Sequence, residues 1–354
     1  MSFSRAAWLR PTKISVLLTL LGARTFEGTS RGRLGAASGA GFLSGSFRRN
    51  FHQRPGGALG TVQLSSALGA GWASRSFSSW TEPSASAPVI VVPVLSDNFS
   101  YLLVDPETKV AAAVDPAEPS KVLTAAKEAG VKITHALVTH KHWDHAGGNE
   151  EISKSVPGIE IVSTAYENIP CVTKALKDGE SIEFGSLRVT ALYTPCHTKG
   201  HVLFFVESLR EPSKDPLLFS GDTLFVGGCG RFFEGEAADM VRALRGVIGQ
   251  LPPNTQVFCG HEYTKSNLKF ALAVEPGNQV LQEKFAWTER TLKEGGVTVP
   301  STVGEEKLFN PFMRLDSPEI REALVKSGRA RGRSAAVLSE ADVMAGLRSW
   351  KNSF

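Results

Sequence analysis

Short apolar runs separated by turn residues fill the middle of the chain. The first runs follow one another closely, with Asp97-Asn98 and Asp105-Pro106 between them. Apolar runs of this length, bounded by Gly, Pro, Asn or Asp, are typical of β-strands. The pattern therefore predicts strands at residues 88–94, 99–104, 109–115, 133–140, 159–163, 186–193, 201–207, 216–222 and 255–261.

Helical spacing of apolar residues appears between these strands and dominates after them. Residues 120–130 predict a helix with Ser120 as its N-cap and Gly130 as its stop. Apolar residues at steps of three and four predict another at 237–251. After Gly260 we expect no further strand. Helices are predicted at 266–274, 278–296 and 339–354, and an irregular connector at 299–314.

The chain thus divides into a leader, a strand-rich α/β domain and a helical C-terminal part. We place the α/β domain at 88–261 and the helical part at 262–354. The four cysteines are widely spaced and form no C-x-x-C pair, which favours buried, reduced thiols over a disulfide framework. They are Cys171, Cys196, Cys229 and Cys259.

Residues 1–80 differ from the rest in composition and charge. They are rich in Ser, Gly, Ala and Arg, and hold nine Arg and one Lys against the single acid Glu27. That excess gives +9, and since the whole chain carries +4, the remainder carries −5. The basic balance therefore belongs to the leader and predicts no nucleic-acid surface on the folded part.

This leader has the composition of a mitochondrial transit peptide. We therefore expect residues 1–80 to be a disordered targeting segment for the mitochondrial matrix, removed near Ser79; a disordered basic tail is the alternative. The apolar stretch at 14–23 is too short to span a membrane, which takes about 20 residues. A cytosolic form is a further possibility and would need a different start, since Met240 is the next methionine after Met1.

The segment THKHWDH, residues 139–145, concentrates histidines at the end of a predicted strand. His140 and His142 are two positions apart, which places both rings on one face of an extended chain. Asp144 and His145 follow where the chain turns. So many imidazoles in a small volume cost stability unless a ligand binds them, and the first candidate is a metal ion.

The same pattern, an apolar strand followed by a side chain that can bind metal, recurs at His197, Asp222 and His261. If the strands lie side by side, their ends share one edge of the sheet and gather five histidines and two aspartates. So many ligands exceed the coordination of one zinc and suit two ions. Asp222 is the expected bridge because a carboxylate offers two oxygens. Nitrogen and oxygen donors without a thiolate fit Zn, Fe or Mn.

The remaining histidines and Cys196 have simpler interpretations. A lone histidine after a strand is more often an ordinary core or surface residue than a ligand. We place His52, His135 and His201 in that class, and we interpret Cys196 as a small buried filler rather than a ligand or nucleophile.

Four motifs, THKHWDH, TPCHTKGH, SGDTLFVGGCGR and CGHEY, resemble the successive signatures of the metallo-β-lactamase superfamily. The longer match, from DNFSYLLVD through GCGRFFEG to VPSTVGEEKLFNPFMR, is similar to glyoxalase II, the hydroxyacylglutathione hydrolases, over residues 88–354. The resemblance implies an αββα four-layer sandwich, an α/β fold, followed by a helical domain that helps bind glutathione. It also implies hydrolysis of S-D-lactoylglutathione to D-lactate and glutathione, a step of methylglyoxal detoxification.

The resemblance further implies a division of the ligands between two divalent ions, zinc being the first choice. One ion would take His140, His142 and His197, and the other Asp144, His145 and His261, with Asp222 and a water or hydroxide between them. We hypothesise that this hydroxide attacks the thioester carbonyl, since metal binding lowers the pKa of water from about 15.7 to around 7. Asp144 and Asp222 would be catalytic, and His201 would support the ligands.

By the same resemblance, Arg231, Tyr263, Arg348 and Lys351 would contact glutathione. The chain departs from the family at two points: Arg231 stands where Lys is common, and Phe233 stands where a hydrogen-bonding Tyr is common. Loss of a hydroxyl contact weakens binding by about 0.5–1.5 kcal/mol. For Arg348 and Lys351, a solvated helix face is the alternative.

Two other functions are compatible with the same motifs. A mononuclear iron glutathione persulfide dioxygenase shares the fold, and a non-catalytic binding protein could retain it. None of the predicted ligands is missing, which disfavours the second. We expect a glutathione thioester as substrate, no nucleic-acid or membrane partner, and a monomer.

Overall fold

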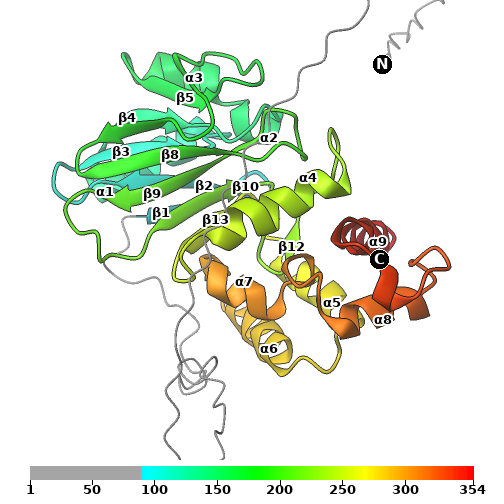
Figure 1. The fold of residues 1–354 in the computed structure, drawn as a ribbon. Helices are drawn as coiled ribbons and strands as arrows, with labels where there is room; N and C mark the ends of the chain where they lie inside the picture. The colour runs from blue at the N-terminus through cyan, green and yellow to red at the C-terminus, as the bar shows by residue number, and fades with distance from the viewer. Residues whose placement is uncertain (1–88) are drawn as a thin grey trace, which may run out of the picture. The chain divides into compact units, whose positions relative to one another are not determined.

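Two six-stranded sheets, packed face to face, form the centre of the protein. The computed structural model describes residues 89–354, so the predicted leader and His52 lie outside the described residues. The strand order is β1-β2-β3-β4-β5-β6 in the first sheet and β14-β13-β10-β9-β8-β7 in the second. Figure 1 shows the two sheets together, with the helices of the C-terminal part beside the second.

The first sheet is mixed. β1, β2 and β3 pair antiparallel as consecutive strands. From β3 to β6 the pairing is parallel. Helix α1 (Pro119–Ala129) returns the chain between β3 and β4, two short helices do so between β4 and β5, and the non-helical segment 165–173 joins β5 to β6. Its strands are β1 (Val89–Val94), β2 (Asn98–Val104), β3 (Val110–Val114), β4 (Lys132–Leu137), β5 (Glu160–Thr164) and β6 (Lys174–Leu176).

The second sheet is antiparallel from β7 to β10, after which β13 joins parallel to β10. A short hairpin of β11 (Leu224–Phe225) and β12 (Gly228–Cys229) follows β10. The strands of the sheet are β7 (Ser181–Phe184), β8 (Leu187–Tyr193), β9 (Val202–Ser208), β10 (Leu217–Gly221), β13 (Gln256–Cys259) and β14 (Ser301–Thr302).

Alternation along the strands explains the layers. In β3, Val114 is buried between the sheets, whereas its neighbour Ala113 faces outward and packs with Val122 of helix α1. In β10, Phe219 is buried between the sheets and Leu218 faces the helices of the other side. Successive side chains of a strand point to opposite faces, so both sheets bury both faces. The result is the expected αββα sandwich.

Helices cover the outer faces. The segment predicted as one helix at 237–251 is α4 (Ala237–Val241) continued by a π-helical turn (Arg242–Val247) and a 3-10 turn (Ile248–Gln250). The other helices are α1 (Pro119–Ala129), α2 (Trp143–Ala146), α3 (Asn149–Ser155), α5 (Thr264–Val274), α6 (Gln279–Lys293), α7 (Val303–Phe309), α8 (Pro318–Lys326) and α9 (Glu340–Asn352).

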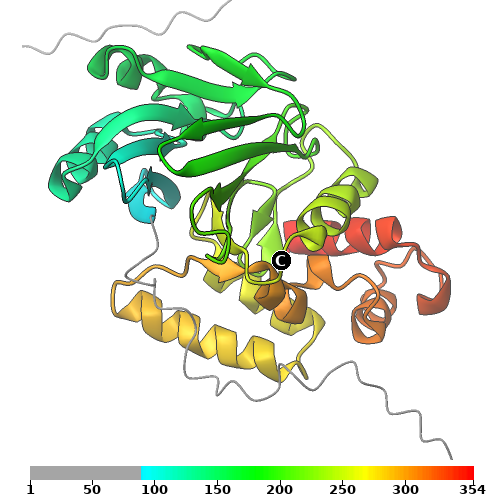
Figure 2. The same ribbon diagram turned by 60° about the vertical axis from the view of Figure 1, so that its left-hand side comes forward.

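The helical C-terminal part shares a core with the second sheet. Val257 of β13 packs in the same cluster as Ile320 of α8 and Val343 of α9. In Figure 2, α9 runs beside α4, so the last helix of the chain lies against the segment that follows β12. This packing brings the end of the chain next to loops of the sandwich.

The predicted strands and helices are confirmed, but β6, β7, β11, β12, α2, α3 and α8 were not predicted. Four further expectations need correction. A strand does follow Gly260, since β14 pairs with β13. The supposed connector at 299–314 contains α7, whose N-cap Thr302 accepts a hydrogen bond from the Glu305 backbone N–H. Helix α1 begins at Pro119 rather than after Ser120, because proline suits the first helical position. Of the cysteines, all free, Cys171 is exposed rather than buried.

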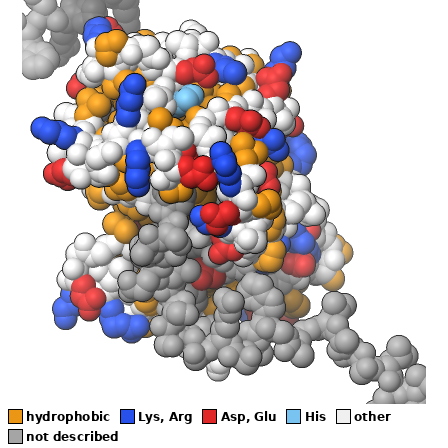
Figure 3. Space-filling model, turned by 90° about the vertical axis from the view of Figure 1, so that its left-hand side faces the viewer, with side chains coloured by type: hydrophobic (Ala, Val, Ile, Leu, Met, Phe, Trp, Pro, Cys, Tyr) orange, Lys and Arg blue, Asp and Glu red, His pale blue; other side chains and the backbone are white. Residues whose placement is uncertain are grey.

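The surface of the described part gives two further observations. Among residues 89–354, no helix combines the length and the apolar character that crossing a bilayer requires. On the face seen in Figure 3, Lys and Arg side chains are interspersed with Asp and Glu side chains. That face therefore presents no extended field of one sign.

Candidate metal centre and substrate cavity

The metal-capable side chains come from two facing sheets, not from one edge of a single sheet as the sequence suggested. One group follows β4 of the first sheet; the others follow β8, β10 and β13 of the second. β9 runs antiparallel to both β8 and β10, and β13 is parallel to β10, so these three strands end on the same side. The loops after them meet the loop after β4 across the top of the sandwich.

All seven predicted ligands converge there. They form three overlapping groups, and in each group the donor atoms lie within 4.8 Å of one another. The groups are His140, His142 and His197; His140, His145 and Asp222; and Asp144, His145 and His261.

Asp222 lies between the other ligands. Its Oδ1 is 3.3 Å from His145 Nε2, and its Oδ2 is 3.4 Å from both His197 Nε2 and His261 Nε2. Asp222 Oδ1 and His145 Nε2 are buried and have no hydrogen-bond partner among the described residues. Buried polar atoms left in this way cost free energy unless a further group satisfies them. A cation shared by the two side chains would do so.

The spacing of the imidazoles fits the same interpretation. His142 Nδ1 lies 3.0 Å from His140 Nε2 and 3.0 Å from His197 Nε2. Neighbouring ligands of a tetrahedral zinc, at about 2.0–2.1 Å from the ion, lie about 3.3 Å apart. Three ring nitrogens at this spacing are therefore better placed to bind one ion together than to hydrogen-bond to one another.

Further hydrogen bonds fix the outer nitrogens of the rings. His145 Nδ1 lies 2.9 Å from Asp115 Oδ2, and Asp115 also accepts from the backbone N–H and the hydroxyl of Thr139, both at 2.7 Å. Thr139 Oγ1 lies 3.1 Å from His140 Nδ1. Such contacts set the tautomer of a histidine ligand and the orientation of its ring.

The second histidine–aspartate set has its own supports. His261 Nδ1 lies 2.9 Å from Asp97 Oδ1, and Asn98 Nδ2 donates to Asp144 Oδ2 at 3.0 Å. From the sequence, Asp97 and Asn98 were expected only to form a turn, and no role was predicted for Asp115. The signal for Asp115 was present, since it too follows directly after an apolar strand.

The residues given ordinary roles behave largely as expected. His135 stacks on Phe184 at 5.0 Å between ring centroids, away from the ligand groups. His201 belongs to none of these groups, and its Nε2 accepts the backbone N–H of Asp222 at 3.1 Å. It therefore positions Asp222. Cys196 is buried, and burial raises the pKa of its thiol to about 12, which makes it inert at neutral pH.

The buried carboxylates and imidazoles of the cluster shift one another's pKa values. Burial opposes ionisation of Asp222, but His145 and His261 hold its pKa well below the usual range. Burial also opposes the charge of His261, yet hydrogen bonds to Asp144 and Asp222 raise its pKa to about 10. Burial, with the neighbouring His145, holds the pKa of His140 well below its ordinary value. A neutral imidazole and an ionised carboxylate are the forms that bind metal. His140 and Asp222 are therefore already in those forms, whereas His261 must release a proton when a metal ion binds.

A cavity of about 600 Å³ opens over these ligands. Its walls come from the loops of the sandwich and from α5 and α9 of the helical part. All five residues expected to contact glutathione line it: Arg231, Phe233, Tyr263, Arg348 and Lys351.

The two basic residues of α9 are not on a solvated helix face. Arg348 is buried, donates from Nη1 to the Cys229 carbonyl at 2.8 Å, and leaves its Nε buried without a hydrogen-bond partner among the described residues. Lys351 Nζ donates to the Ser266 carbonyl at 2.8 Å. Burial and the nearby Arg348 lower the pKa of Lys351 to about 8. The cavity thus holds desolvated cations suited to carboxylates.

The aromatic residues lie closer to the metal ligands. The Tyr263 ring stacks on His261 with centroids 4.6 Å apart and planes 6° apart. The Phe233 ring centroid lies 5.1 Å from that of His197, and the side chain is 59% exposed. Phe233 therefore presents an apolar surface at the mouth of the cavity and has no hydroxyl to donate.

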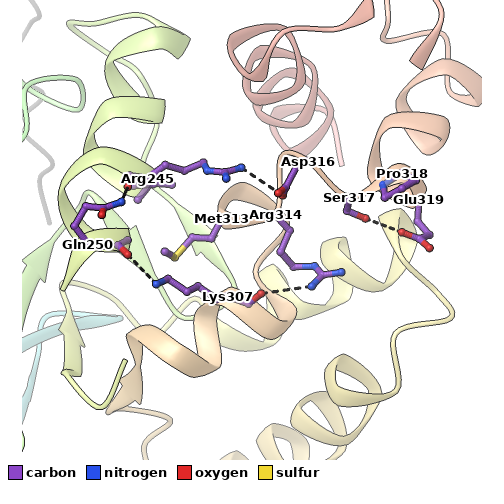
Figure 4. A pocket seen from close by; sticks show the side chains of 11 residues that line it. Arg245, Gln250, Lys307, Met313, Arg314, Asp316, Ser317, Pro318 and Glu319 are labelled. Atoms are coloured by element: carbon purple, nitrogen blue, oxygen red, sulfur yellow. Dashed lines mark hydrogen bonds and ion pairs between the residues drawn. The ribbon is translucent and has the colours of Figure 1, made fainter. Parts of the chain in front are cut away.

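A second cavity, of about 520 Å³, has a different character. Figure 4 shows Arg245 reaching toward Asp316 and Lys307 held against the turn after the π-helical segment. Arg245 Nη1 is 3.3 Å from Asp316 Oδ1, and Lys307 Nζ donates to the Gly249 carbonyl at 2.7 Å. Its cations are already partnered and none of the metal-binding groups lies in it, so the candidate site is the first cavity.

Comparison with known proteins agrees with this geometry. Residues 94–261 match the metallo-β-lactamase superfamily, and residues 262–354 match the family described as hydroxyacylglutathione hydrolase C-terminus. The solved structure of a metallo-β-lactamase from Staphylococcus aureus subsp. aureus COL is 25% identical, with a TM-score of 0.49, over 71% of this chain and 63% of that one.

Three relatives match a large share of the chain. A cytoplasmic hydroxyacylglutathione hydrolase of Arabidopsis thaliana is 47% identical over 66% of this chain and 90% of its own length. A hydroxyacylglutathione hydrolase-like protein of Gallus gallus is 44% identical over 75% and 90%, and a hydroxyacylglutathione hydrolase of Dictyostelium discoideum is 43% identical over 75% and 99%. With its histidine and aspartate groups as the site for divalent metal ions, the chain belongs to the hydroxyacylglutathione hydrolase family of the metallo-β-lactamase superfamily.

Proposed function

We propose that the protein hydrolyses S-2-hydroxyacylglutathione thioesters, S-D-lactoylglutathione among them, to the free 2-hydroxy acid and glutathione. The observation that carries the proposal is a single cavity with the metal ligands at its base and desolvated cations in its wall. Metal ions held by these ligands would suit attack on an acyl carbon, and the cations in the wall suit a substrate that carries carboxylates.

We infer that two ions bind and that they are zinc. The seven donor residues form three overlapping groups, and the Asp222 carboxylate lies within 3.4 Å of His197 and His261. Seven donor residues exceed the four positions of one tetrahedral zinc. Imidazole nitrogens and carboxylate oxygens at these spacings suit zinc, which has no geometric preference of its own. Ions bound there lower the pKa of a coordinated water to around 7 and polarise a carbonyl.

The side chains supply orientation. Asp144 lines the cavity and is fixed by Asn98, so its carboxylate can accept a hydrogen bond from the attacking hydroxide and orient it toward the thioester carbon. The Asp222 backbone N–H donates to His201 Nε2, and this hydrogen bond fixes the Asp222 carboxylate between the other ligands. The leaving group is a thiolate with a pKa of about 8.5, so it departs without a general acid.

The glutathione part would lie toward the helices. Arg348 offers its unpartnered Nε, and Lys351 and Arg231 add positive charge along the same wall. Guanidinium groups bind carboxylates through paired hydrogen bonds, which fixes the thioester relative to the ligands.

The test is metal content and hydrolysis measured on one sample of the full chain. We expect two metal ions per chain by elemental analysis, with rapid loss of the thioester of S-D-lactoylglutathione. A single iron ion, no hydrolysis, and oxygen uptake with glutathione persulfide would contradict the proposal and favour the dioxygenase. Metal without either activity would show that the substrate class is wrong.

Two histidine variants sharpen the test. His142→Gln removes a donor that lies 3.0 Å from two other imidazoles, so it should lower metal content and hydrolysis together. His135→Gln removes a ring that stacks on Phe184 outside the ligand groups, so both quantities should stay at the wild-type level.

We also infer that the protein acts as a monomer and that residues 1–80 direct it to the mitochondrial matrix. All ligands and cavity residues come from one chain, so no second copy is needed to complete the site. The leader inference rests on the Arg-rich, acid-poor composition. Light scattering on the purified protein tests the first. Import and N-terminal sequencing of the full chain, with cleavage expected near Ser79, test the second.

A further inference from the structure

A buried carboxylate outside the metal cavity joins two of the loops that carry ligands. Glu167 lies between β5 and β6, and its side chain is 6% exposed. Its Oε1 accepts from the Lys141 backbone N–H at 2.8 Å and from Thr198 Oγ1 at 3.2 Å. Its Oε2 accepts from the Gly200 backbone N–H at 3.1 Å. One side chain thus receives three donors from two loops that are far apart in sequence.

The contact requires close approach. A Cβ on Gly200 would lie 2.4 Å from Glu167 Cγ, so only glycine allows the loop to come this near. The Lys141 ammonium is 3.9 Å from Glu167 Oε2 and pairs at 2.7 Å with Glu234, on the loop that carries Phe233. The carboxylate therefore sits in a fitted position rather than on an open surface.

Neighbouring aromatic residues hold the backbone around Glu167. Tyr166 stacks against Tyr193 with ring centroids 4.1 Å apart, and its hydroxyl accepts the Asp178 backbone N–H at 3.1 Å. The Tyr193 hydroxyl donates to the Lys199 carbonyl at 2.7 Å. The backbone around Glu167 is therefore connected to the loop after β8 by contacts that do not involve the Glu167 carboxylate.

The positions of the donors single out one ligand group. Lys141 lies between His140 and His142, and Thr198 directly follows His197. These three histidines form one of the metal-binding groups. The group of Asp144, His145 and His261 is supported instead by contacts with Asp115, Asp97 and Asn98.

We propose that Glu167 is a positioning residue, which fixes the loops of the three-histidine group at the spacing that metal binding requires. The inference rests on the proposed function in one respect, that this group binds a metal ion. Without the carboxylate, two backbone N–H groups and a hydroxyl lose their common acceptor and the loops can separate. The other ligand group keeps its supports, so its affinity should not change.

The test compares wild type with Glu167→Gln in the full chain. Glutamine has the same shape as glutamate, but its amide NH₂ is itself a donor. It must therefore face at least one of the three groups that donate to Glu167. We expect the affinity of one of the two metals to fall by about tenfold, as when a partner that orients a ligand is removed. The readouts are chelator competition and titration with cobalt(II), whose visible absorption distinguishes successive sites. Excess metal should restore full occupancy and the wild-type kcat.

Two further variants keep the result interpretable. Thr198→Val removes one of the three donors with little change of shape, and should give a smaller loss at the same site. Glu183→Gln removes an exposed carboxylate that pairs with Arg188, and should leave both affinities unchanged. A Glu167→Gln protein that binds both metals as wild type does, or loses both alike, overturns the inference. The metal content of the wild-type protein is measured in parallel. If wild type itself lacks two metal ions, the proposed function has failed rather than the inference about Glu167.

Discussion

Asp222 Oδ1 and His145 Nε2 lie 3.3 Å apart, both buried, and neither has a hydrogen-bond partner among the described residues. A cation between them would satisfy both, so metal should stabilise the fold as well as serve the reaction. We expect a chelator to lower the melting temperature of the wild-type protein, because a ligand at 100 times its Kd adds about 2.7 kcal/mol of stability.

The variant Asp222→Asn should remove most of that effect. It retains one oxygen and loses the charge and the second oxygen, so metal content should fall and the chelator should shift the melting temperature little. Asp215→Asn is the control, since Asp215 lies on the surface and pairs with Asn254. An Asp222→Asn protein with two tightly bound metals would contradict the bridging role.

Gly260 allows two ligands to approach the backbone closely. A Cβ there would lie 2.3 Å from Asp222 Oδ1 and 2.7 Å from His145 Cε1. Gly260→Ala should therefore displace both ligands and lower metal affinity and hydrolysis. Gly246→Ala is the matched control, because apart from its chain neighbours and the backbone of its own helix no heavy atom lies within 4 Å of its added Cβ. Calorimetric metal titration of the two variants measures the difference, and equal affinities would show that the approach is not needed.

Restoring a hydroxyl at Phe233 should tighten substrate binding. Phe233 lines the cavity beside His197 and cannot donate a hydrogen bond. Phe233→Tyr should lower the KM for S-D-lactoylglutathione by up to about tenfold, corresponding to about 0.5–1.5 kcal/mol for one hydrogen bond. Metal content and kcat should not change. Phe233→Leu, which also lacks a hydroxyl, should keep the wild-type KM, and a similar gain in that variant would exclude a hydrogen bond as the cause.

Lys351 should make substrate capture sensitive to mildly alkaline pH. Burial and Arg348 lower its pKa to about 8, so it is charged below that pH and loses its charge as the pH rises. If the ammonium binds a substrate carboxylate, kcat/KM should fall as the pH rises through about 8, since kcat/KM reports ionisation of the free enzyme. Lys351→Arg should flatten this limb, because a guanidinium stays protonated. An unchanged alkaline limb in that variant would assign the titration to another group.

Much of the fold follows from local patterns. The short apolar runs at 109–115 and 216–222 predicted strands, and the structure confirms them as β3 and β10. Helices such as α9 were equally clear from their spacing. Short elements were not: α7 escaped notice because its seven residues offer barely two turns of periodicity, and its Thr302 cap was not recognised.

The metal ligands were also determined locally, because each follows an apolar strand and is of a type that binds cations. The identity of the donors and the elements that carry them can therefore be inferred from the sequence. The way the donors come together depends on tertiary packing, which brings them from two facing sheets rather than from one edge. The structure also revealed the supports Asp115, Asp97 and Glu167, which pair with residues up to 164 positions away. Hydrogen bonds between segments so distant in the chain depend on how the sheets pack, and no local pattern encodes that packing.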